Sequence, residues 1–491
     1  MLKLYEKFEN NRIVKKINGF QCSVWYPVCF AIIGALACSF DFDYILVYFI
    51  TAATVFALLC NRDYKPMLVT AVLVYFILSL HGDSITLNIS HYEIGHNLSQ
   101  LLQLIINGSV MLAAIVFRLA IDGRLVIGLK KHAFMAGILA MCTAFALNGL
   151  FFEEYSIVNV WMAIIEFAGF FPIYYLMLCA FWGYKKFIPQ LFQLFAILAG
   201  MITLEVFILF IKLHFADGLL VNGGINRDNI VLGWAINNII AETLSLTVPA
   251  TMYLAYSSNK KTGVIGMILL SCLSLVVIFL IQCRAALLFG GIAFAVSLIF
   301  CCIKGPNKKL IRIISCGILG IGGIIFFIML FSGKLESIFG HVFGGNWLDN
   351  DSDRYAIWAI GLDNFRDHPI FGVGFEKYVY PDRHSTLGTA MYTQNMYHNF
   401  IVQFFASCGI VGGLALAFHL FELGKFFFKK RSVAVYFVFG IILLILATSL
   451  LDTFIFCPNI SFFYSILLAA AEINGQEDSE KSAVAANADG V

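Results

Sequence analysis

Long apolar blocks separated by short polar segments run along almost the whole chain. Most blocks are about twenty residues long, the length that an α-helix needs to cross the hydrocarbon core of a bilayer. The pattern predicts an all-α polytopic membrane protein with about 12–14 transmembrane helices. The expected spans are 21–40, 43–60, 64–80, 100–121, 132–152, 157–182, 190–211, 230–256, 263–282, 284–303, 310–331, 396–421, 432–451 and 457–472.

The polar segments divide the chain unevenly. Residues 1–20 form a polar, cytoplasmic N-terminal segment, and residues 21–331 hold the first bundle of helices. The longest polar stretch, 332–395, is predicted to be one large external loop that contains short amphipathic helices. Residues 396–472 return to the membrane, and 473–491 read as a disordered cytoplasmic tail because they are polar and rich in small residues.

Composition supports the membrane prediction. The chain has 491 residues, of which 60% are hydrophobic and 13% charged, and its mean hydropathy is +0.86. Soluble domains are nearer half apolar and a quarter charged. The 13 cysteines lie mostly within apolar blocks and show no zinc-binding spacing, so we interpret them as small buried hydrophobes.

The distribution of Lys and Arg orients the helices. If the N-terminus is cytoplasmic, 24 of the 32 Lys and Arg residues fall in inside segments, eight fall outside, and every inside loop is basic. Cytoplasmic loops of membrane proteins carry such an excess. We therefore expect both termini inside and the 332–395 loop outside.

Arg284 is the first of the outside cations that we single out. It lies in LIQCRAALLFGG, flanked by apolar residues where two spans meet at the outer surface. An arginine there is costly unless it faces a partner or a water-filled cavity. It either extends to the lipid headgroups or forms an anion-binding site.

Arg354 lies in NDSDRYAIWAIGLDNFRDHPIFGVGF, which predicts a short amphipathic helix on the outer membrane face. The apolar positions at helical spacing are Ile357, Trp358, Gly361, Leu362 and Phe365. Pro369 should end the helix, and Gly372 to Gly374 should form a turn. A helix N-terminus with a guanidinium suits a phosphate, although spacing alone favours a solvated arginine beside the neighbouring aspartates.

Three further positions raise the question of a site. His398 is the first polar side chain as the chain re-enters the membrane, and Asn399 follows it. Taken alone, such a histidine is more often an interfacial or capping residue. Glu242 lies within an expected span, close to Asn238. Acids are rare inside membrane spans and are usually paired there. Pairing with Arg284, orientation of His398 and a purely structural ion pair all remain open for Glu242.

Three ordered stretches resemble the O-antigen ligase and O-antigen polymerase superfamily, whose members build bacterial surface polysaccharide. They are QCRAALLFGG, RYAIW followed by FRDHPIFGVG, and HNFIVQFFASCGIVGG. GWAINNIIAETLSLTVP is a weaker similarity, and the resemblance covers about residues 230–425. It departs from the family's usual Ser-Arg-Gly, because Arg284 stands between Cys283 and Ala285.

The resemblance implies a chemistry for these residues. The donor would be an oligosaccharide on undecaprenyl diphosphate, presented at the outer face of the bacterial inner membrane and transferred to an acceptor hydroxyl. Arg284 and Arg354 would bind the diphosphate, and His398 would act as general base. The supporting candidates are Asn238, Glu242 and Asn399. We find no Asp-x-Asp pair suited to a divalent metal, so we expect metal-independent transfer without a cofactor.

The acceptor stays open at this point. A polymerase extends another lipid-linked glycan in O-antigen or capsule assembly, whereas a ligase transfers to lipid A–core or to a protein. Polymerase is favoured because nothing suggests a docking surface for lipid A–core. A lipid-linked oligosaccharide flippase is the alternative class, but repeated halves and broken central helices are not evident. A non-catalytic scaffold would not need Arg284, Arg354 and His398 on one face, and no nucleic-acid partner is expected.

Overall fold

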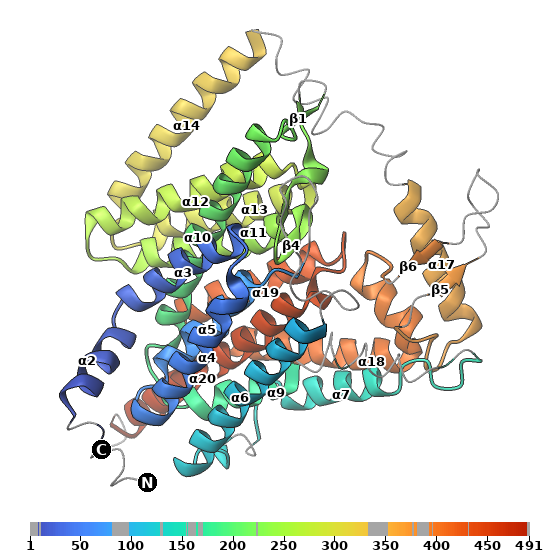
Figure 1. Ribbon diagram of the computed structural model, residues 1–491, viewed down its shortest axis with the longest axis horizontal. Helices are drawn as coiled ribbons and strands as arrows, with labels where there is room; N and C mark the ends of the chain where they lie inside the picture. The colour runs from blue at the N-terminus through green and yellow to red at the C-terminus, as the bar shows by residue number, and fades with distance from the viewer. Residues whose placement is uncertain are drawn as a thin grey trace. The chain divides into compact units, whose positions relative to one another are not determined.

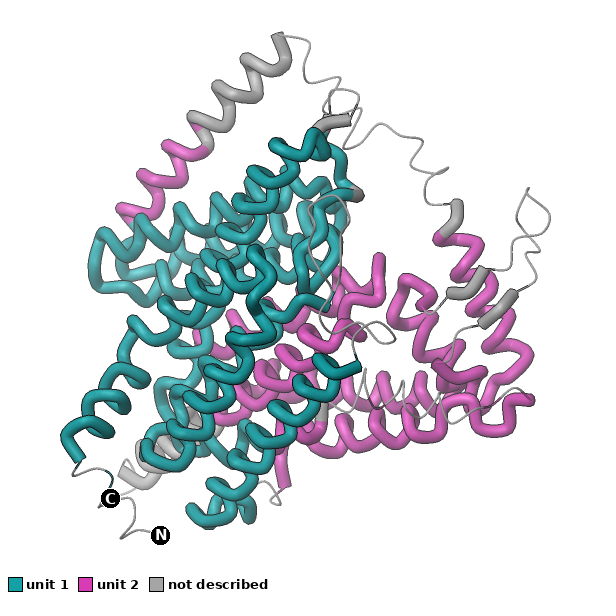
Figure 2. Tube along the Cα trace, in the orientation of Figure 1, with its two compact units in different colours: residues 1–130, 176–308 teal, residues 131–175, 309–491 magenta. Residues whose placement is uncertain are grey.

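The computed structural model describes residues 8, 11–80, 98–127, 131–153, 155, 164, 170–221, 224–331, 352–375, 378–380, 392–394, 396–430 and 432–488. The chain forms two compact units (Figure 2). Unit 1 comprises residues 1–130 and 176–308, and unit 2 comprises 131–175 and 309–491. Residues 131–175, which we had expected in the first bundle, therefore group with the C-terminal part of the chain.

Unit 1 is built from helices with two small hairpins (Figure 1). Its helices are α2 (Arg12–Gln21), α3 (Trp25–Ser39), α4 (Asp43–Cys60), α5 (Lys65–Leu73), η1 (Val74–Ile77), α6 (Leu98–Ile121), α10 (Phe187–Phe215), η3 (Arg227–Asn229), α11 (Asn237–Ser257), α12 (Lys261–Ile281) and α13 (Arg284–Lys304). The antiparallel hairpins pair β1 (Leu220–Val221) with β2 (Gly224–Ile225), and β3 (Val231–Leu232) with β4 (Ala235–Ile236). The centre of the unit is α11, which packs against α10, α12 and α13.

Unit 2 is also helical. Its elements are α7 (Met135–Ala146), α17 (Ser352–Asp367), α18 (Phe400–Lys429), α19 (Val433–Thr448), η4 (Phe454–Phe456), α20 (Pro458–Ala488) and the antiparallel pair β5 (Tyr378–Tyr380) and β6 (Tyr392–Gln394). Both α7 and α17 pack against α18. Two helices contain residues of both units in sequence. Of α14 (Lys308–Phe331), only the first residue belongs to unit 1, and α9 (Phe170–Phe181) passes from unit 2 to unit 1 after residue 175.

Each of the expected spans contains a helix, which confirms the all-α polytopic class. By length and composition, six helices in the described part of the chain can cross a membrane: α4, α6, α10, α12, α13 and α18. A seventh span would combine α2 and α3, which are bent by 71° at their junction. Large apolar side chains on α6, such as Leu102, Ile105 and Ile106, are exposed, as expected for a helix surface that faces lipid.

A buried carboxylate ties three segments of unit 2 together. The Glu472 side chain in α20 is 2% exposed, and its Oε1 lies 2.6 Å from His132 Nδ1. Its Oε2 accepts from the Ala133 amide at 3.0 Å and from the Tyr174 hydroxyl. This one side chain therefore satisfies polar groups just before α7 and in α9. Beyond it, α20 continues to Ala488, so residues that we had assigned to a polar tail are helical.

We predict that Glu472→Ala destabilises unit 2, because it removes the hydrogen bonds of Glu472 to two buried side chains and to one partly buried amide. The cost should be on the order of 3 kcal/mol, and the unfolding temperature in detergent should fall clearly. Asp363→Ala is the matched control, since the Asp363 side chain is 58% exposed. Equal unfolding temperatures for the two variants would contradict the role of Glu472.

Candidate active site

The chain enters α18 through Asn399, which caps the helix. Its Oδ1 accepts from the amides of Ile401 at 2.9 Å and Val402 at 3.2 Å, as an N-cap asparagine does. Its Nδ2 donates to Leu450 O at 2.9 Å, so the start of α18 is also tied to the corner that follows α19. Asn399 thus has a structural task that the sequence left open.

His398 stands in a strained backbone conformation. Its φ is +49°, in the left-handed region that costs a non-glycine residue about 1–2 kcal/mol. The neighbours on its C-terminal side hold it there, since Phe400 N also donates to Ser449 O at 2.9 Å. Strain of this kind is retained where the surrounding structure fixes it, and it gathers at functional sites.

The imidazole of His398 pairs with a carboxylate that the sequence analysis did not single out. His398 Nδ1 lies 2.9 Å from Asp452 Oδ1, and the two side chains are 34% and 18% exposed. With Nδ1–H donated to the carboxylate, Nε2 carries the lone pair that can accept a proton. The pair therefore has the arrangement of a general base held by an acidic partner.

Asp452 is placed to remain ionised. Burial alone would raise the pKa of its carboxyl, but the hydrogen bond and charge of His398 act in the opposite direction. The Thr453 amide, which donates to Oδ1 at 2.7 Å, and the positive charge of Arg354 add to that effect. The net result is a lowered pKa for Asp452, so the carboxylate persists below its usual titration range.

Arg354 reaches the same corner. The expected amphipathic helix exists as α17, with Arg354 in its first turn. Its Nη1 donates to Leu451 O at 2.5 Å, which uses one of the five N–H donors of the guanidinium. Four successive residues, 449–452, thus bind Phe400, Asn399, Arg354 and His398 in turn.

A break in α18 binds the turn that follows α17, and this holds α17 against α18. The helix is interrupted at Gly409, where φ is +62° and ψ is −154°. The carbonyls of Ala406 and Ser407 accept from Val373 N at 2.9 Å and Gly374 N at 3.0 Å. In return, Ile410 N donates to Pro369 O at 2.7 Å and Val411 N to Ile370 O at 3.3 Å. The turn at 369–374 therefore replaces the backbone partners that α18 loses at its break.

Two glycines make this exchange possible. A Cβ on Gly372 would lie 2.3 Å from Ala406 O, and a Cβ on Gly409 would lie 2.3 Å from Ile370 O. We expected no broken central helix from the sequence, and this expectation was wrong for α18. A continuous apolar stretch does not reveal such a break, because the residues that fill it lie elsewhere in the chain.

The remaining candidates lie in unit 1. Arg284 is the first residue of α13, directly after Gln282 and Cys283 close α12. Glu242 is 1% exposed near the start of α11. A Cβ on Gly290 would lie 3.1 Å from Ser245 Cβ, and Cys301 Sγ lies 3.6 Å from Met252 O. These contacts show that α11 and α13 run in parallel, so Arg284 and Glu242 lie at the same end of the pair.

Asn238, at the start of α11, accepts a hydrogen bond from another arginine, Arg227. Arg227 Nη2 donates to Asn238 Oδ1 at 2.6 Å, and Asn237 Nδ2 donates to the Arg227 carbonyl at 3.0 Å. Arg227 is one of the eight Lys and Arg residues that the predicted topology places outside, but its sequence context gave no reason to select it. The asparagine therefore holds a cationic loop in place.

Asp452 is the residue that sequence reasoning missed. It is a lone acid in SLLDTFIF, at the outer end of an expected span. An acid at the end of a span is as unusual as a cation on the outer side, and this signal in the sequence points to Asp452. Three Asp-x-Asp spacings were not considered: Asp41 with Asp43, Asp349 with Asp351, and Asp351 with Asp353. Asp43 is fully buried and accepts from Ser79 N at 3.0 Å, whereas the other two pairs lie outside the described side chains.

The described helices are those of an all-α multi-pass membrane protein. Residues 253–417 match a family model described as O-antigen ligase. The match includes Arg284, Arg354 and His398 and ends before Asp452. It supports the resemblance to the O-antigen ligase and polymerase superfamily, and this family implies a glycosyltransferase-like activity of the ligase or polymerase type. A comparison with the curated proteins found no match.

We predict that Asp452→Asn lowers stability by an amount that depends on pH. The pKa of Asp452 is lower in the folded protein than in the unfolded chain, so its stabilising effect is present above about pH 4 and is lost as the pH falls through the lowered pKa. At pH 7 the loss should be on the order of 1 kcal/mol. Unfolding temperatures from pH 7 to pH 3 measure it, with Asp363→Asn as the exposed control. A gap to wild type that widens in acid would contradict the prediction.

Proposed function

We propose that the chain is a glycosyltransferase of the outer face of the bacterial inner membrane that moves an oligosaccharide from undecaprenyl diphosphate to an acceptor hydroxyl. The observation that carries this proposal is the His398–Asp452 pair beside Arg354 in unit 2. An oriented base and an adjacent guanidinium are what a transfer from a diphosphate requires. The base activates the acceptor, and the cation stabilises the leaving group.

The transfer would proceed in one displacement. The acceptor hydroxyl gives its proton to His398 Nε2 while its oxygen bonds to the anomeric carbon of the donor. The bond between that carbon and the diphosphate oxygen breaks, and undecaprenyl diphosphate leaves with the electron pair. Asp452 stabilises the imidazolium that forms, and Arg354 offsets the charge that develops on the diphosphate.

Arg284 would supply the second cation. A guanidinium binds phosphate oxygens in pairs and stays charged at every relevant pH. As the first residue of the 21-residue helix α13, Arg284 also adds to the positive end of the helix dipole. Two fixed cations would neutralise a diphosphate without a metal, which is the basis for proposing metal-independent transfer.

The flippase alternative is less well supported. Transporters of several folds present broken helices to their cargo, and α18 has such a break. In this chain, however, the backbone groups exposed by the break bond to residues 369–374. The break therefore serves to attach α17, and a ligand is not needed to satisfy it.

We predict that the purified protein, reconstituted with undecaprenyl-diphosphate-linked repeat units alone, forms a ladder of longer glycans and releases undecaprenyl diphosphate. A polymerase uses one donor molecule as acceptor for another, so no further acceptor is needed. Product only after addition of lipid A–core or protein would make the chain a ligase. Movement of the lipid across the bilayer without a new glycosidic bond would make it a flippase. A chelator should leave the rate unchanged, and loss of rate restored by Mg²⁺ would disprove metal independence.

We predict that Arg284→Lys lowers the transfer rate roughly 10- to 100-fold, because the charge remains while the paired hydrogen bonds to phosphate are lost. Protein level should not change. Arg366→Lys, in α17 with a side chain that is 74% exposed, is the control and should retain full activity. If Arg284→Ala assembles glycan normally, Arg284 extends to the headgroups and has no part in transfer.

A further inference from the structure

A groove within unit 1 has apolar walls and one polar end. Its volume is about 410 Å³, within the range of about 300–1,000 Å³ typical of ligand sites. It is lined by the junction of α2 and α3 and by residues of α5, α10, α11 and α12. The apolar walls include Val28, Leu68, Leu194, Ile197, Leu254 and Met267. The polar end is formed by Gln21, Ser23, Lys65 and Gln190.

Two glutamine side chains that line the polar end each carry one oxygen without a hydrogen-bond donor. Gln21 is 4% exposed, and its Nε2 donates to Ala53 O at 3.1 Å, which fixes the orientation of the amide. Its Oε1 is buried without a hydrogen-bond partner. Gln190 Nε2 likewise bonds to the Tyr184 hydroxyl at 2.7 Å, and Gln190 Oε1 is buried and unpaired. Each such oxygen costs about 1–3 kcal/mol, which a ligand carrying hydroxyl donors would recover.

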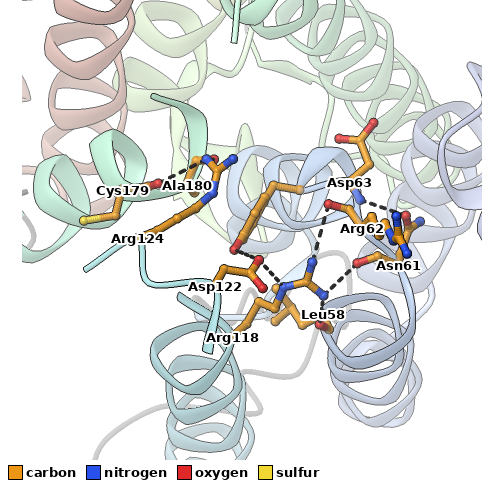
Figure 3. Close-up of polar contacts among 10 residues, drawn as sticks. Leu58, Asn61, Arg62, Asp63, Arg118, Asp122, Arg124, Cys179 and Ala180 are labelled. Atoms are coloured by element: carbon orange, nitrogen blue, oxygen red, sulfur yellow. Dashed lines mark hydrogen bonds and ion pairs between the residues drawn. The ribbon is translucent and has the colours of Figure 1, made fainter. Parts of the chain in front are cut away.

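Polar contacts of Arg118 hold the segment that precedes Lys65 in sequence (Figure 3). Arg118, which is 4% exposed, donates through Nη1 to Leu58 O at 2.8 Å and to Asn61 O at 2.9 Å. Its Nε binds Asp122 Oδ2 at 2.7 Å. The C-terminal end of α4 is therefore fixed just ahead of Lys65.

The charge of Lys65 is only partly offset. Its Nζ lies 3.6 Å from Asp63 Oδ2, and the two side chains are 31% and 34% exposed. An exposed pair at this distance is weak, so Lys65 can also attract a phosphate. Asn61 Nδ2 contacts Cys22 Sγ at 3.2 Å and thereby connects this corner to the junction of α2 and α3.

The helix α2 indicates where the groove lies in the membrane. Apolar side chains at Ile13, Ile17, Phe20 and Val24 recur at helical spacing and are exposed. The basic residues Arg12, Lys15 and Lys16 are exposed beside them. Because α2 is amphipathic, basic and bent by 71° from the next helix, it suits the membrane interface among the headgroups better than a span shared with α3. The polar end of the groove begins where α2 ends, so it is at headgroup level.

We propose that this groove binds an anionic phospholipid whose headgroup carries hydroxyls. One acyl chain lies along the apolar walls, the phosphate lies at Lys65, and the headgroup hydroxyls donate to Gln21 and Gln190 Oε1. Basic residues near a bilayer surface attract anionic lipid by about 1 kcal/mol each, so α2 and Lys65 together select for a negative headgroup. This proposal does not depend on the reaction that the protein catalyses.

The test uses the full-length protein, purified and delipidated in a mild detergent. Phosphatidylglycerol and phosphatidylcholine with the same acyl chains are added separately, and bound lipid is counted by native mass spectrometry. Phosphatidylglycerol should bind and raise the unfolding temperature. Phosphatidylcholine, which has neither net charge nor a hydrogen-bond donor, should bind more weakly. A photoreactive phosphatidylglycerol labelled on its acyl chain should attach to peptides containing Leu194 or Met267.

Three variants separate the parts of the site. Lys65→Gln should weaken phosphatidylglycerol binding roughly five-fold. Gln21→Leu should weaken it roughly two- to ten-fold and reduce the preference over phosphatidylcholine. Ile197→Trp should block the acyl chain and abolish binding. Lys304→Gln, which removes an exposed lysine at the end of α13, should bind like wild type.

Four results would overturn the proposal. They are equal binding of the two lipids, binding of neither lipid, wild-type affinity in both Lys65→Gln and Ile197→Trp, and photolabelling of peptides remote from the groove. If Ile197→Trp does not fold, Lys65→Gln and the labelled peptides still decide the question.

Discussion

The reciprocal backbone hydrogen bonds at Gly409 are the interaction on which the candidate site depends. A helix in a membrane must satisfy its backbone groups within the protein, because lipid offers no partners. By breaking α18, the chain frees carbonyl and amide groups that the turn at 369–374 takes up. That turn follows α17 directly, so the break determines where Arg354 stands relative to His398. Loss of the exchange would separate the cation from the base.

The corner at residues 449–452 completes the arrangement. It holds the strained His398 from one side through Asn399 and Phe400, and from the other through Asp452. Because Arg354 binds the same corner, base, acid and cation share one support. In the proposed reaction a small displacement of these groups would be costly in rate, so their shared support would bear directly on catalysis. Unit 1 uses the same principle at its own polar end, where Arg118 fixes the backbone that presents Lys65.

The sequence predicted what depends on local pattern. Block length gave the helices, and the charge asymmetry drew attention to Arg284 and Arg354. The sequence alone could not predict contacts between residues that lie far apart along the chain. Asp452 lies 54 positions from His398, and the backbone partners at the break in α18 are 33 to 41 positions apart in the sequence. Glycines in an apolar stretch usually indicate close helix packing, so the left-handed turn at Gly409 was hidden within an ordinary pattern.

The central claim is that His398 is the general base, and His398→Asn tests it most directly. Asparagine tolerates the left-handed backbone and its amide can donate to Asp452, but it cannot accept the proton. Donor binding and turnover should be measured on the same reconstituted sample. Binding should stay near wild type while turnover falls by on the order of 10²–10⁴, the usual range for loss of a general base. Full turnover, or loss of donor binding in parallel with turnover, would contradict the assignment.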